Sequence, residues 1–272
     1  MDLIKSIILG VVQGLSEFLP ISSSGHLVLA QEILNFKPEG IAFEIFVHFG
    51  TLLAVLVIFR HDIWEMIKCL PWIPKFVFSG FKVVTARDKY TSLALNIIVG
   101  SIPAAVVGIL FTREIEQLFD SPLLVLCALF VTGVIIWSSR YTWDTETPVT
   151  GITAFIIGIA QAFAILPGIS RSGSTIVTAM WLRVNRNKAA TFSFLLSIPV
   201  IFGASLTKFK ELVVSPPPTN DIIELTAATL ASAISGYIAI VWLLQIIRKN
   251  KFEWFGIYCI LISFIGFLLI YL

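Results

Sequence analysis

Two stretches of this chain gather side chains that could act on a phosphate group. The first contains Glu17, three consecutive serines and His26, and the second contains Arg171 within a run of hydroxyl side chains. A carboxylate or an imidazole can move a proton, a serine hydroxyl can attack phosphorus, and a guanidinium can bind phosphate oxygens through two hydrogen bonds. These residue types favour phosphoryl transfer at a site to which both stretches contribute.

The two stretches are copies of one pattern. Glycines, glutamines and serines align at a constant offset of 148 residues, for example Gln13 with Gln161. Glu17 and His26 occur only in the first copy, and Arg171 occurs only in the second. Two similar frames with complementary charges are what a site shared between two halves requires.

In the first copy, Gln13 and Glu17 are four residues apart, so a helix places them on one face. A carboxylate inside a membrane protein is costly and usually lines a cavity or meets a cation. Glu17 could instead lie at the membrane surface or only pair with Arg171 as a structural lock. Because a polar turn follows it, we favour a functional role.

That turn supplies hydroxyl groups, a glycine and an imidazole before a helix that we expect to start at about Leu27. A helix start presents free backbone amides that suit phosphate oxygens, and serines also cap helices. Capping accounts for at least one of the serines, whereas His26 favours a catalytic role. We assign catalysis to Glu17 and His26, and substrate binding to Gln13, Ser22, Ser24 and Gly25.

In the second copy, Arg171 is the costly group. A guanidinium near the bilayer centre costs at least about 2.5 to 3.5 kcal/mol on insertion scales, so an anion should meet it. Glu17 can serve when the site is empty, and a phosphate can serve when it is filled. Capping explains one or two of the hydroxyls around Arg171, and we assign substrate binding to Ser170, Ser172, Gly173, Ser174 and Thr175.

A second acid and imidazole, Glu44 and His48, lie one helical turn apart in an apolar run. Such a pair could hold a proton, a metal ion or each other. We interpret both as a second layer that orients the residues of the turns.

The composition indicates an integral membrane protein. Of the 272 residues, 57% are hydrophobic and only 13% are charged, and the mean hydropathy is +0.93. A net charge of +2 without a dense basic block argues against nucleic acid, and the three cysteines show no metal or disulfide spacing. The chain lacks a P-loop, a zinc-protease motif and a nucleophile elbow, which disfavours ATP hydrolysis and zinc-dependent proteolysis.

We predict an all-α polytopic membrane protein with six transmembrane helices and two re-entrant helical hairpins. The hairpins, at about 4–34 and 150–182, are broken near their middles by Pro20 and Pro167. The chain forms one membrane domain of two repeats, about 1–140 and 148–272. The six apolar runs lie at about 41–59, 93–111, 122–139, 188–206, 222–247 and 252–272.

Loop charges predict the orientation of the spans. Thirteen lysines and arginines fall on one set of connections, including six in the 60–92 connection, which we interpret as an interfacial segment. Only five fall on the other set, so the basic set is cytoplasmic and both chain ends are external. Three spans separate the hairpins, which makes the repeats inverted. The five external residues are Lys5, Lys37, Arg113, Lys208 and Lys210.

The stretches from Gln13 to His26 and from Pro167 to Thr175 resemble the two signature motifs of the undecaprenyl-diphosphate phosphatase family, also called bacitracin-resistance proteins. The resemblance covers the whole chain. It implies removal of one phosphate from a polyprenyl diphosphate at the external face of the bacterial cytoplasmic membrane, which recycles the lipid carrier for cell-wall polymers.

The resemblance also implies roles for single residues. Glu17 matches the essential acid, Ser23 and His26 match the catalytic serine and histidine, and Arg171 matches the essential arginine. It further implies a divalent metal, calcium or magnesium, held near Glu17. Many members carry a first Glu where this chain has Gln13. An amide cannot act as a base, so any base in this pair must be Glu17. Ser23, His26 and water all stay open as the nucleophile.

Two other functions fit parts of the pattern. Inverted repeats with broken helices are common in secondary transporters, so a transporter or flippase of polyprenyl phosphate is the main alternative. A scaffold protein would keep Glu17 and Arg171 only as a structural ion pair.

Small residues such as Gly133, Ala231 and Ser235 permit close helix packing within one chain or in a homodimer.

Overall fold

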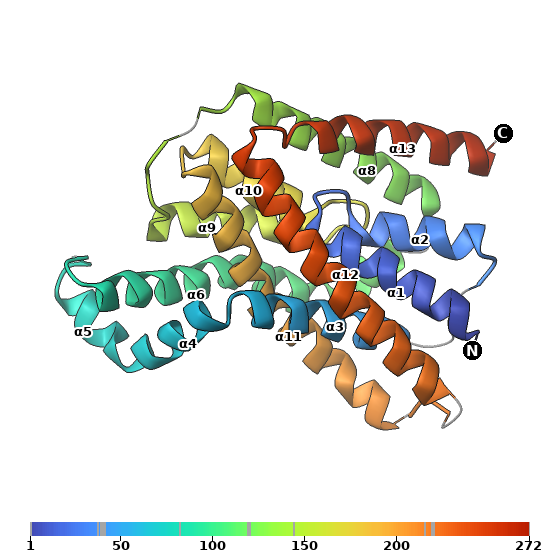
Figure 1. Ribbon diagram of the computed structural model, residues 1–272, viewed down its shortest axis with the longest axis horizontal. Helices are drawn as coiled ribbons and strands as arrows, with labels where there is room; N and C mark the ends of the chain where they lie inside the picture. The colour runs from blue at the N-terminus through green and yellow to red at the C-terminus, as the bar shows by residue number, and fades with distance from the viewer. Residues whose placement is uncertain are drawn as a thin grey trace.

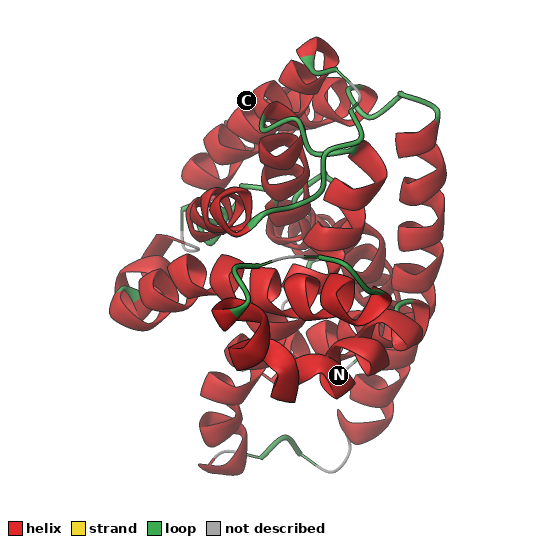
Figure 2. Ribbon diagram, turned by 90° about the vertical axis from the view of Figure 1, so that its left-hand side faces the viewer, coloured by secondary structure: helices red, strands yellow, loops and turns green. Residues whose placement is uncertain are grey.

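The structure is a computed structural model, and it describes residues 2–36, 38, 42–81, 83–118, 121–143, 145–214, 216–218 and 221–271. Lys37 and Lys82, which entered the charge comparison, lie outside these residues, as do the side chains of Arg113, Lys208 and Lys210. The described residues form helices joined by loops, with no strand among them (Figures 1 and 2). The predicted all-α class is therefore confirmed.

The helices follow the apolar runs of the sequence. A helix covers most of each of the six predicted spans, and each predicted hairpin contains two helices. In chain order they are α1 (Leu3–Phe18), α2 (Ser23–Ile33), α3 (Ala42–Ile58), α4 (Arg60–Cys69), η1 (Leu70–Trp72), α5 (Ile73–Phe78), α6 (Ala86–Leu110), α7 (Thr112–Leu118), α8 (Pro122–Ser138), η2 (Ser139–Tyr141), α9 (Gly151–Phe163), α10 (Arg171–Trp181), α11 (Arg186–Val214), α12 (Ile222–Arg248) and α13 (Trp254–Tyr271).

Among the described residues, four helical segments are long and apolar enough to cross a membrane: α6, Pro122–Tyr141, Arg186–Leu206 and α12. A fifth span results if α3 and the α4–α5 segment count as one, although the chain bends by 81° between them. The apolar helix α13 is shorter than these four segments. The protein is thus a multi-pass membrane protein with four or five such candidate spans.

The first predicted break lies between α1 and α2. Leu19, which precedes Pro20, is extended with φ −61° and ψ 141°, because a residue before proline avoids the helical region. Ser22 then caps α2 by accepting a hydrogen bond from the Gly25 amide at 3.3 Å. Helix α2 starts at Ser23, four residues earlier than expected, since the cap makes the serines its first turn.

The second predicted break lies between α9 and α10. The chain turns through Pro167 and Gly168, whose φ of +93° is readily available only to glycine. Ser170 caps α10 by accepting a hydrogen bond from the Gly173 amide at 3.1 Å. Both breaks therefore end in a serine cap, and α10 starts at Arg171.

The glycines of the repeated pattern let helices approach closely. A Cβ atom at Gly10 would lie 2.4 Å from the Ala228 carbonyl oxygen in α12. A Cβ atom at Gly158 would lie 2.3 Å from the Gly100 carbonyl oxygen in α6. The first helix of each half thus packs against a long helix of the other half.

The other small residues singled out in the sequence also serve packing inside the chain. Gly133 in α8 lies against Gly256 and Ile260 in α13, and these two helices run side by side in Figure 1. Ser235 in α12 lies against Gly14 in α1. These contacts are intramolecular.

Alanine at Gly10 or Gly158 should lower the free energy of unfolding by about 1–3 kcal/mol, because the new methyl group overlaps backbone of the neighbouring helix. Unfolding of the purified protein in detergent measures this. Gly203→Ala is the control, since nothing lies within 4 Å of a Cβ atom there. Equal stabilities for all three variants would contradict the packing.

Candidate functional site

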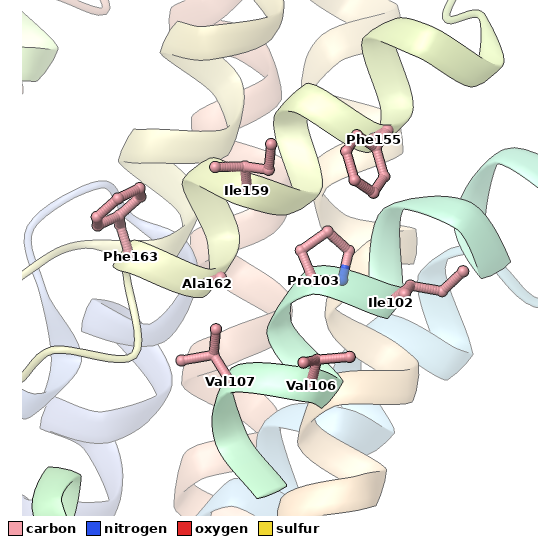
Figure 3. A pocket seen from close by; sticks show the side chains of 8 residues that line it. All are labelled: Ile102, Pro103, Val106, Val107, Phe155, Ile159, Ala162 and Phe163. Atoms are coloured by element: carbon pink, nitrogen blue, oxygen red, sulfur yellow. The ribbon is translucent and has the colours of Figure 1, made fainter. Parts of the chain in front are cut away.

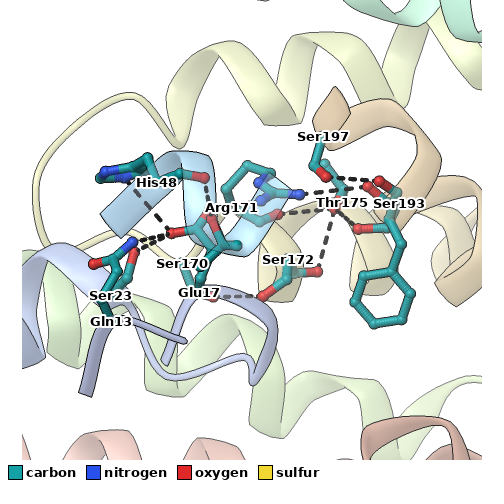
Figure 4. Close-up of polar contacts among 12 residues, drawn as sticks. Gln13, Glu17, Ser23, His48, Ser170, Arg171, Ser172, Thr175, Ser193 and Ser197 are labelled. Carbon is teal, nitrogen blue, oxygen red and sulfur yellow. Dashed lines mark hydrogen bonds and ion pairs between the residues drawn. The ribbon is translucent and has the colours of Figure 1, made fainter. Parts of the chain in front are cut away.

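Four side chains from four helices gather around the carboxylate of Glu17 (Figure 4). Arg171 donates a hydrogen bond from Nη2 to Oε1 at 2.7 Å. Ser23 donates from Oγ to Oε2 at 2.7 Å, and Gln13 donates from Nε2 to the same oxygen at 3.0 Å. His48 Nε2 lies 3.9 Å from Oε2. Glu17 is therefore the centre of the polar cluster.

The two charges at this centre come from opposite halves of the chain. The side chains of Glu17 and Arg171 are only 8% and 12% exposed, so little water screens their attraction. Arg171 also reaches the backbone oxygen of Ser193 from Nη1 at 3.4 Å. The meeting of acid and arginine predicted from the sequence is thus present in the structure.

The helix repeat explains the first half of the cluster. Gln13 and Glu17 are neighbours on one face of α1, as their spacing predicted, and the last turn of α1 carries them to the break. Ser23 is the first residue of α2, so the same break turns its hydroxyl back toward Glu17. Because the Glu17 carboxylate accepts a hydrogen bond from the Ser23 hydroxyl, it is placed to receive the proton of that hydroxyl.

Other hydroxyls of the two turns fasten the hairpins to each other. Ser24 Oγ accepts a hydrogen bond from the Gly168 amide at 3.0 Å. Ser172 Oγ donates to the Leu19 backbone oxygen at 3.3 Å. These contacts hold Glu17 against Arg171.

The remaining hydroxyls of the second turn are buried among protein partners. Thr175 Oγ1 lies 2.6 Å from Ser193 Oγ, and the Ser170 amide donates to Thr132 Oγ1 at 2.9 Å. Ser174 belongs to the same buried first turns of α10. Ser170, Ser174 and Thr175 thus form the buried start of α10, the helix that carries Arg171.

His26 lies apart from the cluster. Its Nδ1 is 3.0 Å from the Ser22 backbone oxygen, and its Nε2 is 2.8 Å from the Tyr258 hydroxyl in α13. The two rings are stacked with centroids 5.6 Å apart. Neither ring nitrogen of His26 therefore bonds Glu17 or Ser23, although the sequence analysis grouped the three residues.

The second acid and imidazole have different positions. His48 Nδ1 lies 2.8 Å from the backbone oxygen of Glu44, so the contact between them uses the Glu44 backbone. His48 reaches the cluster itself, next to Glu17. His48 is thus the histidine closest to the predicted chemistry.

Several residues at the site were missed in the sequence. Tyr258 is one aromatic residue among many in the last apolar run, and no spacing distinguishes it. Thr132 likewise lies in an unbroken apolar run. Ser193 did carry a signal, because Phe192 and Ser193 follow Phe43 and Glu44 at an offset of 149 residues, which extends the repeat weakly beyond the two turns.

The cluster offers a limited set of ligands for a metal ion. No three His, Cys, Asp or Glu side chains gather at one point in the part of the chain that the structure describes. Glu17 and His48 supply one carboxylate oxygen and one nitrogen, and Gln13 and Ser23 can add oxygens. A divalent cation fits there if phosphate or water supplies further oxygens.

An apolar pocket of about 380 Å³ lies elsewhere, between α6 and α9 (Figure 3). It has no charged side chain, so it suits hydrocarbon and cannot bind phosphate. Its walls are Ile102, Pro103, Val106, Val107, Phe155, Ile159, Ala162 and Phe163.

Known proteins match this chain over nearly its full length. The family model described as bacitracin resistance protein BacA matches residues 6–265. A protein named undecaprenyl-diphosphatase from Christiangramia forsetii is 38% identical, with 100% of this chain and 99% of that protein covered. Proteins of the same name from Methanobrevibacter smithii and Desulfatibacillum aliphaticivorans are 40% and 41% identical, with 98% and 97% of each chain covered.

Replacement of Glu17 by Gln should cost about 3–5 kcal/mol of stability, because it leaves the Arg171 guanidinium buried without an anion. Combining it with Arg171→Met should recover much of that loss. Detergent unfolding of both single variants and the double variant measures the coupling. Glu146→Gln is the control, because the Glu146–Lys188 pair is exposed. Additive losses at Glu17 and Arg171 would contradict the ion pair.

Proposed function

The chain belongs to the BacA family of bacitracin resistance proteins, and we propose that it is an undecaprenyl-diphosphatase. The enzyme hydrolyses undecaprenyl diphosphate to undecaprenyl phosphate and inorganic phosphate. This recycles the lipid carrier for cell-wall synthesis and protects against bacitracin. Relatives named undecaprenyl-diphosphatase that match this chain over nearly its whole length support this proposal over the transporter alternative.

One observation carries the chemistry: a single buried carboxylate, that of Glu17, binds both the Ser23 hydroxyl and the Arg171 guanidinium at 2.7 Å. Phosphoryl transfer depends mainly on positioning and on cations around the phosphate oxygens. Ser23 offers a nucleophile with an adjacent base, and Arg171 offers the cation. In the absence of substrate, Glu17 compensates the charge of Arg171.

The reaction takes place in two steps. Glu17 Oε2 accepts the Ser23 proton as Ser23 Oγ forms a bond to the terminal phosphorus, and the bond from that phosphorus to the bridging oxygen breaks. The electron pair leaves with undecaprenyl phosphate. The oxygen of a water molecule then forms a bond to the phosphorus of the phosphoserine, and the bond to Oγ breaks. Both protons of the water leave with inorganic phosphate as H₂PO₄⁻, and the proton held by Glu17 returns to Oγ. Arg171 binds the phosphate oxygens in both steps.

The other predicted site residues have supporting roles in this proposal. Gln13 orients the Glu17 carboxylate, and the free amides at the starts of α2 and α10 face the phosphate. Glu17 would hold a divalent cation, calcium or magnesium, which would supply positive charge to neutralise the diphosphate. Inorganic phosphate leaves from the same cluster.

The membrane arrangement is part of the proposal. We assign six spans and two inverted re-entrant hairpins, with repeats at about 1–140 and 148–272. The reciprocal packing of α1 on α12 and of α9 on α6 supports this symmetry. Figure 1 shows both chain ends toward one end of the molecule and the basic α4 and α5 toward the other. The site opens to the external face of the bacterial cytoplasmic membrane.

Purified protein in detergent micelles with magnesium or calcium should release phosphate from a polyprenyl diphosphate. Ser23→Ala, Glu17→Gln and Arg171→Met should each lower kcat about 100-fold or more, because each removes a group that acts on the transferred phosphate. Ser101→Ala is the control, since its hydroxyl bonds only within α6. Micelles enclose no compartment, so transport cannot contribute to the phosphate signal. If the wild-type protein released no phosphate, the proposed enzyme activity would be rejected.

Rapid quench with labelled diphosphate separates the possible nucleophiles. A base-labile, acid-stable phosphoprotein that disappears in Ser23→Ala is expected. His26→Gln and Tyr258→Phe should keep the adduct with activity reduced about 10-fold or less, because their contact lies on α13 and away from Glu17. An acid-labile, base-stable adduct would contradict the serine, and absence of any adduct would favour water.

A further inference from the structure

The second histidine of the site has a defined chemical orientation. His48 Nδ1 lies 2.8 Å from the Glu44 backbone oxygen, and a carbonyl oxygen can only accept a hydrogen bond. The proton of the neutral ring is therefore on Nδ1, and Nε2 carries a free electron pair. This is the usual arrangement of a histidine that ligates a metal through Nε2.

The free electron pair belongs to the nitrogen that lies 3.9 Å from Glu17 Oε2. A neutral Nε2 and a carboxylate oxygen are both acceptors, so they make no hydrogen bond with each other. A cation between them would interact favourably with both atoms. Two donors bound to one cation at about 2.1–2.4 Å can be up to about 4.8 Å apart, so one ion can reach both atoms. The His48–Glu17 gap has the dimensions of a shared cation.

The neighbours of this gap can complete such a site. Gln13 Nε2 and Ser23 Oγ lie 3.0 and 2.7 Å from the same Glu17 oxygen. A half turn of the Gln13 amide presents its carbonyl oxygen in place of its NH₂ group, which gives a third oxygen donor with the carboxylate and the hydroxyl. The Arg171 guanidinium occupies the other carboxylate oxygen, Oε1, and leaves this side to the cation.

We propose that His48 is a nitrogen ligand, together with Glu17, of the divalent cation that binds at this site. The inference rests on the proposed function for the role of the ion, which is to hold the diphosphate. It goes further by adding imidazole nitrogen to a centre otherwise made of oxygens. Imidazole binds manganese and later transition metals better than calcium or magnesium, so this chain should bind Mn²⁺ more tightly than Ca²⁺.

Mn²⁺ alone tests the proposal with the intact protein in detergent. Pulsed electron paramagnetic resonance of the bound ion should show coupling to one ¹⁴N nucleus. His48→Gln should remove that coupling and weaken Mn²⁺ binding about 10-fold or more. Glu17→Gln should also weaken Mn²⁺ binding.

The chain has only three histidines, which gives two matched controls. His61 is exposed on α4, so His61→Gln should change neither Mn²⁺ binding nor phosphate release. His26→Gln should keep the ¹⁴N coupling, because His26 faces Tyr258.

The outcomes separate this inference from the proposed function. Phosphate release by a wild-type protein whose bound Mn²⁺ shows no ¹⁴N coupling would reject His48 as a ligand and leave the enzyme intact. If the wild-type protein shows ¹⁴N coupling that His48→Gln removes but has no diphosphatase activity, His48 is confirmed as a ligand and the proposed enzyme activity is rejected. Coupling that survives in His48→Gln, or that only His26→Gln removes, would also overturn the assignment.

Discussion

The ion pair between Glu17 and Arg171 is the interaction on which the rest of the structure depends. Each charge alone would be costly in a buried, apolar environment, and each comes from a helix break that also exposes backbone polar groups. The pair compensates both charges, and Ser22 and Ser170 each satisfy one amide in the first turn of the helix that follows. Stability and chemistry therefore depend on the same few side chains.

The interior around this pair is apolar and closely packed. Phe18, next to Glu17, packs edge to face on Phe194 with ring centroids 5.8 Å apart, and both rings are buried. Because the Glu17 side chain is only 8% exposed, each hydrogen bond to its carboxylate is stronger than it would be at a surface. The close helix contacts at Gly10 and Gly158 hold these surroundings in one geometry.

Local chemistry explains what could be predicted from the sequence. Proline and glycine mark the two helix breaks, and the i, i+4 spacing of Gln13 and Glu17 places them on one face. The charge argument paired Glu17 with Arg171. The direction of His26 could not be foreseen, because it depends on the packing of α2 beside α13 and on Tyr258, which lies 232 residues away in the chain. Long-range packing leaves no local signature in a uniformly apolar run.

The bonds between the two turns have a consequence for synthesis. Ser24 meets Gly168, and Leu19 meets Ser172, so each turn uses polar groups of the other. The ribosome makes the first half well before the second, so α1 and α2 exist while the partners of Glu17 and Ser24 in the second turn do not. The turn between α1 and α2 therefore acquires these bonds only after α10 has been made, so assembly of the site is a late step of folding.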